Sequence, residues 1–387
     1  MQQEREEITA HRNRMRLVSL FCGGGCFSSA AAELEGVEVV LGVDSWGVGV
    51  QTFRENHPTA RIEARTLPCA FTELALPSVR NVHLQLSPPC VAFSSSRRGR
   101  ESEDEVALGV RLLAWSVEFA VRHGFGSFSV ENVATEGVYH VFERVRAAHA
   151  GKFDFCEVEA GKLGGCSDRT RLVGGSPPLV DRLKAAPNRP ICTIRQAFDA
   201  AGAPIPTGAT HVRNCSGRVK SGETVFSLRD AATERALTVV ASRALVFCDA
   251  SGATVRQLSP RESAVLMGVS RIKLPPKAKD ALRVVGNGVE GNTAKAVLTA
   301  AMEALGADPP EPPEPPAPPD RAAIDAAITE SVDGHVRWFA ERKRARETVL
   351  QRAAREGVAR GKVLKIFNAL ASSCTTPGLP PNSPSKD

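Results

Sequence analysis

Short apolar runs alternate with longer runs that carry apolar residues at helical spacing, beginning at Leu17. This alternation is typical of a parallel β-sheet whose successive strands are joined by helices. The strand predictions are residues 17–21, 37–43, 82–86 and 125–130, and the helix predictions are residues 28–34, 48–56 and 106–123. Residues 17–175 are therefore expected to form a doubly wound α/β domain.

The pattern changes after Gly174. Proline-rich pieces and short runs punctuated by glycine extend to about Val255 without a βα alternation. We interpret residues 176–255 as a smaller lobe inserted into the first domain. A helix start follows, with Ser259 as the cap, Pro260 at the first helical position and Glu262 three residues after the cap. Residues 256–306 are expected to return to the first domain.

Three segments flank this region. Residues 1–16 are polar and charged and form an N-terminal extension. Residues 307–320 contain the run DPPEPPEPPAPPD, and since proline fixes φ and lacks a backbone donor, we predict an extended linker. We predict that residues 321–387 form a basic helical tail that contains the run RKRAR at 342–346. Such a tail is suited to binding a protein or nucleic-acid partner.

Composition excludes several classes of protein. The chain has 387 residues, 42% of them hydrophobic and 24% charged, which are ordinary values for a globular protein that carries one large domain or two domains. No apolar run approaches the roughly 20 residues of a membrane-spanning helix. Ten cysteines include no C-x-x-C pair, so we expect no structural zinc site. Residues 1–16 are polar and charged where a secretory signal would be apolar, so we expect reduced thiols without disulfides and an intracellular location. The net charge of +6 permits a polyanionic partner without requiring one.

The segment LFCGGGCF at 20–27 runs from a predicted strand through glycines into a helix. Phe21, Gly23, Gly24 and Gly25 form a turn that lets a ligand approach the backbone at a helix N-terminus, although such turns also serve as plain connections. Asp44 ends the next strand, where a carboxylate can bind ribose hydroxyls or merely cap a helix.

Cys90 follows a strand directly, in the segment SPPCVAFS at 87–94. Catalytic sites of open α/β sheets lie at the carboxyl ends of the strands, and two prolines would hold the thiol rigidly. A single cysteine is otherwise more often a small buried side chain. The position after the strand favours the interpretation as a nucleophile.

Two further segments carry charged residues that suit a site. Glu131 in SVENV lies at the end of a predicted strand, where most glutamates are simply solvated. Arg169 and Arg171 in SDRTRL alternate, which places both guanidinium groups on one face of a strand; a solvated basic strand is the alternative.

Together these segments resemble the DNA cytosine-5 methyltransferase family, in identity and in order. LFCGGGCFS is similar to the family's AdoMet-binding loop, VDSW to its ribose-binding acid, SPPCVAFS to its nucleophile loop, ENV to its catalytic glutamate and SDRTRL to its arginine pair. RQLSPRE with LMG, VGNGV and TIRQAF are similar to later motifs of the family. The resemblance covers about residues 17–305.

The resemblance implies a Rossmann-like, AdoMet-dependent methyltransferase sheet with an inserted target-recognition lobe. It implies methyl transfer to C5 of a cytosine flipped out of double-stranded DNA, through a covalent bond between Cys90 and C6, without a metal. Glu131 would act at ring N3, Arg171 at O2, and Arg169 would position the loop or stabilise the thiolate. AdoMet would be bound by Phe21, Gly23, Gly24, Gly25, Asp44, Ser45, Trp46, Pro89, Asn287 and Val289.

In the implied complex the protein acts as a monomer, and the small lobe reads the target. Its basic residues Arg189, Arg195, Arg213, Arg218 and Lys220 are candidates for phosphate or guanine contacts. A restriction-modification role would add a partner endonuclease, which the sequence neither requires nor excludes.

The sequence departs from the family pattern at several places. Cys26, Val91 and Ser167 replace a glycine and two glutamines, and Glu290-Gly291 replaces a pair of prolines. The related tRNA cytosine-5 methyltransferases, which also carry an SPPC loop, remain an alternative, although their CFT motif is absent here and its nearest approximation, Phe247-Cys248-Asp249, does not match it. A catalytically weak nucleic-acid-binding homologue is the second alternative.

Overall fold

The structure is a computed structural model that describes residues 14–74, 76, 81–90, 92–93, 102–215, 218–220, 223–306 and 320–355. The chain divides into two compact units, Met1–Val332 and Asp333–Asp387. All of the candidate site residues belong to the first unit.

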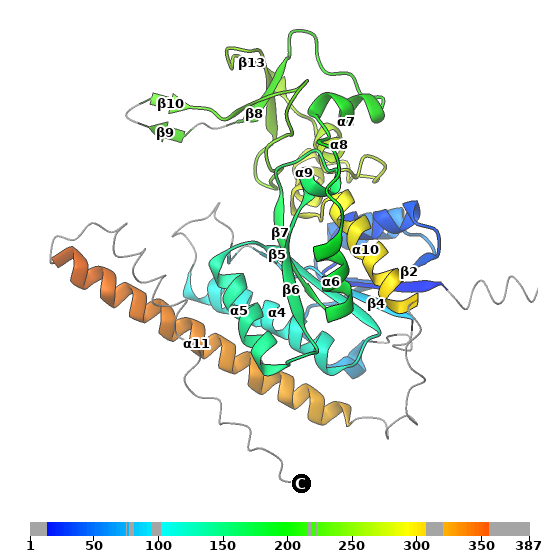
Figure 1. The fold of residues 1–387 in the computed structure, drawn as a ribbon, viewed down its shortest axis with the longest axis vertical. Coiled ribbons are helices and arrows are strands. Elements are labelled where there is room, and N and C mark those ends of the chain that lie inside the picture. Colours follow the sequence, from blue (N-terminus) through cyan, green and yellow to red (C-terminus); the bar gives the residue numbers. More distant parts are fainter. Residues whose placement is uncertain are drawn as a thin grey trace, which may run out of the picture. The chain divides into compact units, whose positions relative to one another are not determined.

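A seven-stranded sheet forms the centre of the first unit (Figure 1). Its strands are β1 (Met15–Leu20), β2 (Val37–Asp44), β3 (Arg61–Ala64), β4 (Val82–Leu86), β5 (Ser127–Val133), β6 (Asp154–Glu159) and β7 (Thr170–Gly175), in the order β3-β2-β1-β4-β5-β7-β6. The first five strands are parallel, whereas β7 is antiparallel to both of its neighbours. The predicted doubly wound α/β fold is confirmed.

The strand order reverses at β1, which lies between β2 and β4. In open α/β sheets, ligands bind outside the carboxyl ends of the strands on either side of such a reversal. The central strands are also the most buried: every residue of β4 is buried, and Leu17, Leu20, Leu84 and Leu86 have no exposed surface. Burial of each leucine contributes roughly 1.5–3 kcal/mol. The strand ends therefore project from a rigid base.

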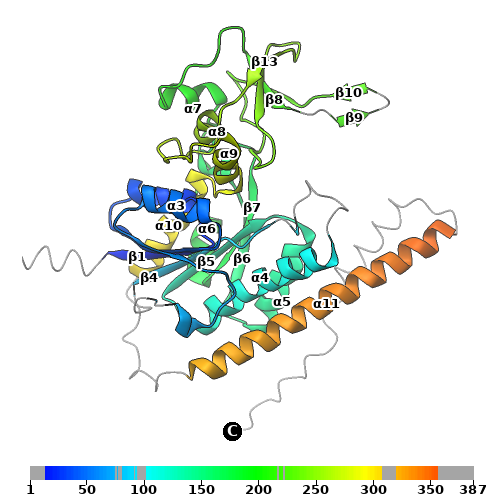
Figure 2. The ribbon, with the colours of Figure 1, turned by 180° about the vertical axis from the view of Figure 1, so that it is seen from behind.

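Helices cover both faces of the sheet. Figures 1 and 2 show α4 (Glu103–Arg122) and α5 (Glu136–Ala148) together on one face, with α6 (Pro177–Ala185) and α10 (Gly291–Gly306) on the other. Helix α3 (Gly47–Asn56) packs on β2 and β3. The segment predicted as one helix at 28–34 is instead the short helix α2 (Cys26–Ser29), continued by a 3-10 turn η1 (Ala30–Glu33). The helix starts as soon as the glycines end.

The smaller lobe contains an antiparallel sheet. Its strands are β8 (His211–Asn214), β11 (Leu228–Asp230), β12 (Leu245–Cys248) and β13 (Thr254–Gln257), in the order β11-β8-β12-β13, and a hairpin of β9 (Arg218–Lys220) and β10 (Glu223–Val225) extends from it. Helix α7 (Ile194–Ala200) packs on this lobe through Phe198, whose ring contacts Phe247 edge to face. Helix α6, by contrast, packs against α10 and β6 of the large sheet, so we place the start of the lobe after Ala185 rather than at 176.

The chain continues through α8 (Pro260–Leu266) and α9 (Ala278–Asn287), which pack in one apolar cluster with Phe198 and Phe247 of the small lobe. The predicted cap at Ser259 is confirmed. The Ser259 hydroxyl accepts from the Glu262 amide at 3.2 Å, and the Ser259 amide donates to the Glu262 carboxylate at 2.7 Å. This reciprocal pair satisfies two backbone donors that the helix leaves open.

Helix α11 (Arg321–Arg355) crosses the boundary between the two units. Its first turns belong to the first unit, where Ile328 and Val332 are buried and Ser331 donates a hydrogen bond to Glu118 at 2.6 Å. The predicted linker lies outside the described residues except for Asp320, as do residues 1–13 of the predicted extension and 356–387 of the predicted tail. Within the described residues, none of the helices is long and apolar enough to cross a membrane.

Candidate active site

The candidate residues gather where β1, β2, β4 and β5 end. Phe21 and the glycines follow β1, Asp44 is the last residue of β2, and Cys90 follows β4. The backbone joins these strand ends, since the Ser87 amide donates to the carbonyl of Leu20 at 3.2 Å. The sequence placed Glu131 at the end of its strand, whereas β5 continues to Val133.

Asp44 holds the glycine turn in place. One carboxylate oxygen accepts from the amide of Gly23 at 2.8 Å, and the other accepts from the amide of Trp46 at 2.8 Å. Gly23 has φ of +53°, and a side chain added there would meet no atom within 4 Å, so this position faces open space. The acid therefore fixes both of the loops that border this space.

Gly24 and Gly25 are required by close packing. A Cβ atom at Gly24 would lie 2.6 Å from Cγ1 of Val284, and one at Gly25 would lie 2.8 Å from Nε2 of His57. Gly25 also has φ of +88°, a left-handed conformation that other residues adopt only with strain. Gly24 and Gly25 therefore set the conformation of the turn. Of the three glycines Gly23, Gly24 and Gly25, only Gly23 borders open space.

Trp46 and Ser45 follow Asp44 at the start of α3. Ser45 is exposed, and Trp46 is half-buried, with the guanidinium of Arg283 stacked 4.2 Å from its ring centroid. Arg283 lies on α9, far from Trp46 in the sequence. It is a candidate site residue that the sequence did not indicate, because a lone arginine in a helix carries no local signal.

The loop that carries Cys90 is anchored from β5. The side chain of Asn132 donates a hydrogen bond to the carbonyl of Pro88 at 3.0 Å, while Pro89 is exposed and Cys90 is half-buried. The role of Asn132 was also not predicted, although it follows Glu131 directly. Val91 and residues 94–100 lie outside the described residues.

The environment of the Cys90 thiol has opposing effects on its pKa. Burial raises the pKa above its ordinary value and outweighs the effect of Arg171, which lowers it; Glu131 raises it and Arg169 lowers it by smaller amounts. These interactions bring together the nucleophile, the acid and both arginines that the sequence predicted as one group. The thiol is protonated at neutral pH, so its activation requires a change in this environment.

Glu131 and Arg171 form an ion pair beside the thiol. Their Oε1 and Nε atoms are 2.8 Å apart, and each side chain is only slightly exposed, at 11% and 13%. The pair spans β5 and β7, whose antiparallel register sets Arg171 opposite Val133. Arg171 also donates to the carbonyl of Thr170 at 2.7 Å, which fixes the orientation of its guanidinium group.

Arg169 is buried and holds three backbone segments together. Its guanidinium donates to the carbonyls of Gly288 at 2.8 Å, Val239 at 3.2 Å and Gly286 at 3.4 Å. Burial, followed by the nearby charge of Arg171, lowers the pKa of Arg169 to about 9. These bonds occupy the two terminal nitrogens of the guanidinium group, whereas its buried Nε has no hydrogen-bond partner. The direct effect of Arg169 in the fold is to position the turn at 286–288, beside its smaller effect on the pKa of the thiol.

Asn287 and Val289 flank that turn with different exposures. Asn287 is exposed at the end of α9, and Val289 is buried in the core that α10 forms with β1. Glu290 is also buried, where it accepts from the Thr293 amide at 2.8 Å and from Asn292 at 2.9 Å, and its burial raises its pKa. Glu290 thereby caps the N-terminus of α10. The pair of prolines that the resembled family has in place of Glu290-Gly291 could not do so, because a proline side chain forms no hydrogen bonds.

Cys26, which stands where the family has a glycine, packs against Gly288. A Cβ atom at Gly288 would lie 2.5 Å from the Cys26 sulfur, and the thiol donates to the carbonyl of Val284 at 3.5 Å. This buried thiol therefore fills space between α2 and the end of α9. The third departure, Ser167, is buried without a hydrogen-bond partner for its hydroxyl.

The basic residues of the small lobe differ in availability. Arg213 is buried: it donates to Gly252 at 3.0 Å and Thr254 at 2.8 Å, and it lies 3.9 Å from the ring centroid of Phe226. Because these contacts occupy its guanidinium group, Arg213 is a poor candidate for a DNA contact. Arg195 and Arg189 are exposed and remain candidates.

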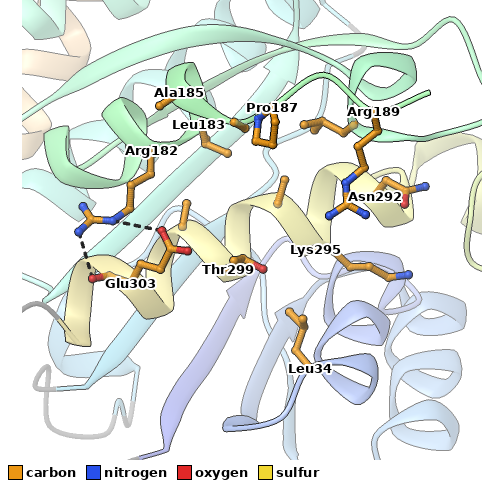
Figure 3. Close-up of a pocket in the computed structure, with 14 residues that line it drawn as sticks. Leu34, Arg182, Leu183, Ala185, Pro187, Arg189, Asn292, Lys295, Thr299 and Glu303 are labelled. Atoms are coloured by element: carbon orange, nitrogen blue, oxygen red, sulfur yellow. Dashed lines mark hydrogen bonds and ion pairs between the residues drawn. The ribbon is translucent and has the colours of Figure 1, made fainter. Parts of the chain in front are cut away.

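A cavity of about 400 Å³ lies apart from these residues, between α6 and α10 (Figure 3). Arg182 and Glu303 form an ion pair of 3.4 Å along its edge, and Arg189, Asn292 and Lys295 also line it. None of the predicted catalytic or cofactor-binding residues borders this cavity. It therefore adds nothing to the assignment of the site.

Solved structures share this architecture. One, described as a proposed DNA modification methyltransferase encoded within an E. coli prophage, aligns with a TM-score of 0.51 at 18% identity over 75% of this chain and 99% of its own. The chain has a methyltransferase fold. The Entamoeba histolytica methyltransferase EhMeth aligns with a TM-score of 0.50 at 12% identity, over 76% of this chain and 99% of its own. No protein family and no curated protein sequence matches the chain.

Proposed function

We propose that this protein transfers a methyl group from AdoMet to C5 of cytosine in double-stranded DNA. The observation that carries the proposal is the group formed by Cys90, Glu131 and Arg171, with the 2.8 Å ion pair between the acid and the arginine beside the thiol. A nucleophile, an acid and a cation at one sheet edge are what addition to a pyrimidine ring requires. The fold shared with methyltransferases supports the same assignment.

The residues around Asp44 fit AdoMet. Gly23 faces open space, Asp44 fixes the loops on both sides of that space, and Ser45 is exposed beside it. We assign the cofactor to the region bordered by Phe21, Gly23, Asp44, Ser45, Trp46 and Pro89, with Gly24, Gly25, Asn287 and Val289 shaping its walls. When bound there, AdoMet supplies an electrophilic methyl group.

Cys90 performs the first step assigned to the protein. Its thiolate forms a bond to C6 of the cytosine, and the ring electrons shift toward C5 so that C5 becomes the nucleophile. Glu131, as a neutral acid, donates to ring N3 and stabilises the charge that develops there, while Arg171 donates to O2. After C5 is methylated, its proton leaves to a base and the C6–sulfur bond breaks, which regenerates the thiolate.

The ion pair links substrate binding to this chemistry. In the free protein, Glu131 is paired with Arg171 and Cys90 is protonated because burial raises its pKa. A cytosine that enters between the acid and the arginine satisfies both side chains. Glu131 then takes up the proton that Cys90 releases and no longer raises the pKa of Cys90, and Arg171 remains to stabilise the thiolate.

A base within a duplex cannot reach Cys90, so the substrate cytosine is flipped out of the stack. The small lobe, with its exposed arginines and its β9–β10 hairpin, reads the flanking bases. We propose that the protein acts inside the cell, as a monomer, and that its basic tail provides a separate contact with protein or nucleic acid.

One experiment tests the assignment. The full-length protein is incubated with radiolabelled AdoMet and with duplex DNA or tRNA, beside Cys90→Ala and the control Cys156→Ala, which alters a partly exposed thiol on β6. We expect label in DNA for the wild type and the control, and none for Cys90→Ala.

The other outcomes are equally informative. Label in tRNA alone would favour the tRNA methyltransferase alternative, and label in neither would favour a nucleic-acid-binding protein. DNA that contains 5-fluorocytosine tests the covalent step directly, because fluorine at C5 blocks release of the adduct. A stable complex should form with the wild type and not with Cys90→Ala.

A further inference from the structure

Two thiols outside the candidate active site belong to the same apolar cluster. Cys166 is buried in the segment before β7, and Cys192 is partly exposed directly before the cap of α7. Although 26 positions separate them in the sequence, each thiol is the group with the largest effect on the pKa of the other. The cluster on which both pack lies at the base of the small lobe.

The backbone fixes both thiols to one short segment. Cys166 accepts at its carbonyl from the amide of Ala236 at 2.8 Å, and the Asp168 amide donates to the carbonyl of Ala236 at 2.8 Å. On the other side, the amide of Ile194 donates to the carbonyl of Glu234 at 3.0 Å. The segment 234–236 thus bonds to Cys166 and to Ile194, two residues after Cys192, and so brings the chain segments of the two cysteines side by side.

The two thiols differ in reactivity. The interaction with Cys166 lowers the pKa of Cys192, and the same interaction together with burial raises the pKa of Cys166. Cys192 is the more exposed of the two and therefore meets a reagent from solvent first, and Cys166 is the buried thiol next to it. An exposed attacking thiol with a resolving thiol beside it is the arrangement that allows a disulfide to form and to be reduced.

We propose that Cys166 and Cys192 are a reversible oxidation site that takes low-molecular-weight disulfides such as oxidised glutathione. The Cys192 thiolate attacks one sulfur of the reagent, which forms a mixed disulfide and releases one thiolate. Cys166 then attacks the Cys192 sulfur, loses its proton to solvent and releases the second thiol. Two protein thiols are oxidised to one disulfide, and one disulfide reagent is reduced to two thiols.

The location of this bond gives it a structural consequence. Cys166 lies three residues before Arg169, which holds the turn at 286–288, and Cys192 lies where the chain enters the small lobe. The disulfide ties the start of the lobe covalently to the segment that positions Arg169. The oxidised protein should consequently unfold at a higher temperature than the reduced one.

The test is made on the full-length protein with oxidised glutathione at pH 7.5, followed by alkylation, trypsin digestion and mass spectrometry. We expect one linked species that joins peptide 163–169 to peptide 185–195 and that disappears on treatment with dithiothreitol. Cys192→Ser and Cys166→Ser should each abolish it, whereas Cys156→Ser, at another partly exposed cysteine, should leave it intact.

Persistence of glutathione on Cys192 without the linked species would overturn the proposal, and so would reaction of Cys192 no faster than Cys156. If Cys166→Ser does not fold, the Cys192→Ser variant alone decides whether the proposal holds, because Cys192 is the more exposed of the two cysteines. The readout is a peptide mass and requires no methyl transfer. The result therefore stands whether or not the function proposed above is correct.

Discussion

Oε1 of Glu131 lies 2.8 Å from Nε of Arg171, in a pair that is almost completely shielded from solvent. Breaking such a pair is costly when one charge is left alone, and it is tolerated when a ligand replaces both partners. A pyrimidine amide edge offers such a replacement, because ring N3 accepts from an acid and O2 accepts from a guanidinium group. The two side chains satisfy each other in the free protein, and we therefore expect them to separate for a ligand with the complementary pattern.

Glu131→Gln should lower kcat more than it raises KM for DNA. The amide can still contact ring N3 but cannot transfer a proton to it, and general acid catalysis typically contributes about 10²–10⁴-fold. We expect kcat to fall by at least about 100-fold in a steady-state assay of methyl transfer. Glu143→Gln is the matched control, because it removes an exposed ion pair with Arg146 of 2.6 Å, and it should leave kcat unchanged. An equal loss in both variants would contradict a specific role for Glu131.

The alkylation rate of Cys90 should rise with pH toward a pKa above the ordinary value of a thiol, because burial raises that pKa and only the thiolate reacts. Glu131→Gln removes a charge that raises the pKa, so alkylation at neutral pH should become faster. Arg171→Gln removes the strongest influence that lowers it, so alkylation should become slower. Each unit of pKa corresponds to a change of about tenfold in the thiolate fraction at neutral pH.

Iodoacetamide labelling of the Cys90 peptide, followed by mass spectrometry over a range of pH, measures these rates without any substrate. Opposite changes in the two variants are the expected result. If both variants changed the rate in the same direction, altered access to the loop rather than charge would explain the effect, and the assigned electrostatics would be wrong.

Asp44→Ala should weaken binding of AdoMet while leaving the duplex affinity unchanged. The carboxylate accepts from the amides of Gly23 and Trp46, and the loss of a hydrogen bond to a charged group costs about 1.5–3 kcal/mol. We therefore expect Kd for AdoMet to rise by roughly 10- to 100-fold in isothermal titration calorimetry. Glu35→Ala, at an exposed position in the turn before β2, serves as the control. Unchanged AdoMet affinity in Asp44→Ala would place the cofactor elsewhere.

Local signals account for most of what the sequence predicted. Glycines and prolines after apolar runs mark strand ends, so the positions of Gly23, Asp44 and Cys90 at one edge of the sheet followed from the chain alone. The cap at Ser259 was predictable for the same reason, since Ser259 and its hydrogen-bond partner Glu262 lie within four residues of the chain. Features of this kind depend on neighbouring residues and on the general rule for parallel sheets.

The remaining features depend on partners that are distant in the sequence. The bond from Asn132 to Pro88, the stacking of Arg283 on Trp46 and the burial of Arg213 each involve residues far apart in the chain. Helix α6 looks like part of the Pro-rich lobe in the sequence, and only its packing against α10 assigns it to the large sheet. No periodicity or spacing contains this information, because it arises from tertiary contact.

The start of α11 should be required for stability, although it follows the proline-rich linker. A chain that ends at Gly306 loses Ile328 and Val332, each of which contributes roughly 1.5–3 kcal/mol when buried, and it also loses the hydrogen bond from Ser331 to Glu118. A chain that ends at Val332 keeps all three. We therefore expect the shorter chain to lose about 3 kcal/mol or more in urea unfolding, and the longer chain to match the full-length protein.

The stability that the hydrogen bond from Ser331 to Glu118 contributes should depend on pH, because the pKa of Glu118 is shifted in the folded protein. Burial raises the pKa of Glu118, but hydrogen bonds from His149, Ser331 and Arg122 outweigh it and lower the pKa to about 2. Because the folded pKa lies below the unfolded value, the stabilisation is present above about pH 4 and is lost as the pH falls toward 2. Ser331→Ala in the full-length protein should therefore be less stable than the wild type at pH 7, and the gap should narrow below pH 4. Equal stability of the chains that end at Gly306 and Val332 would mean that the fold is complete without α11.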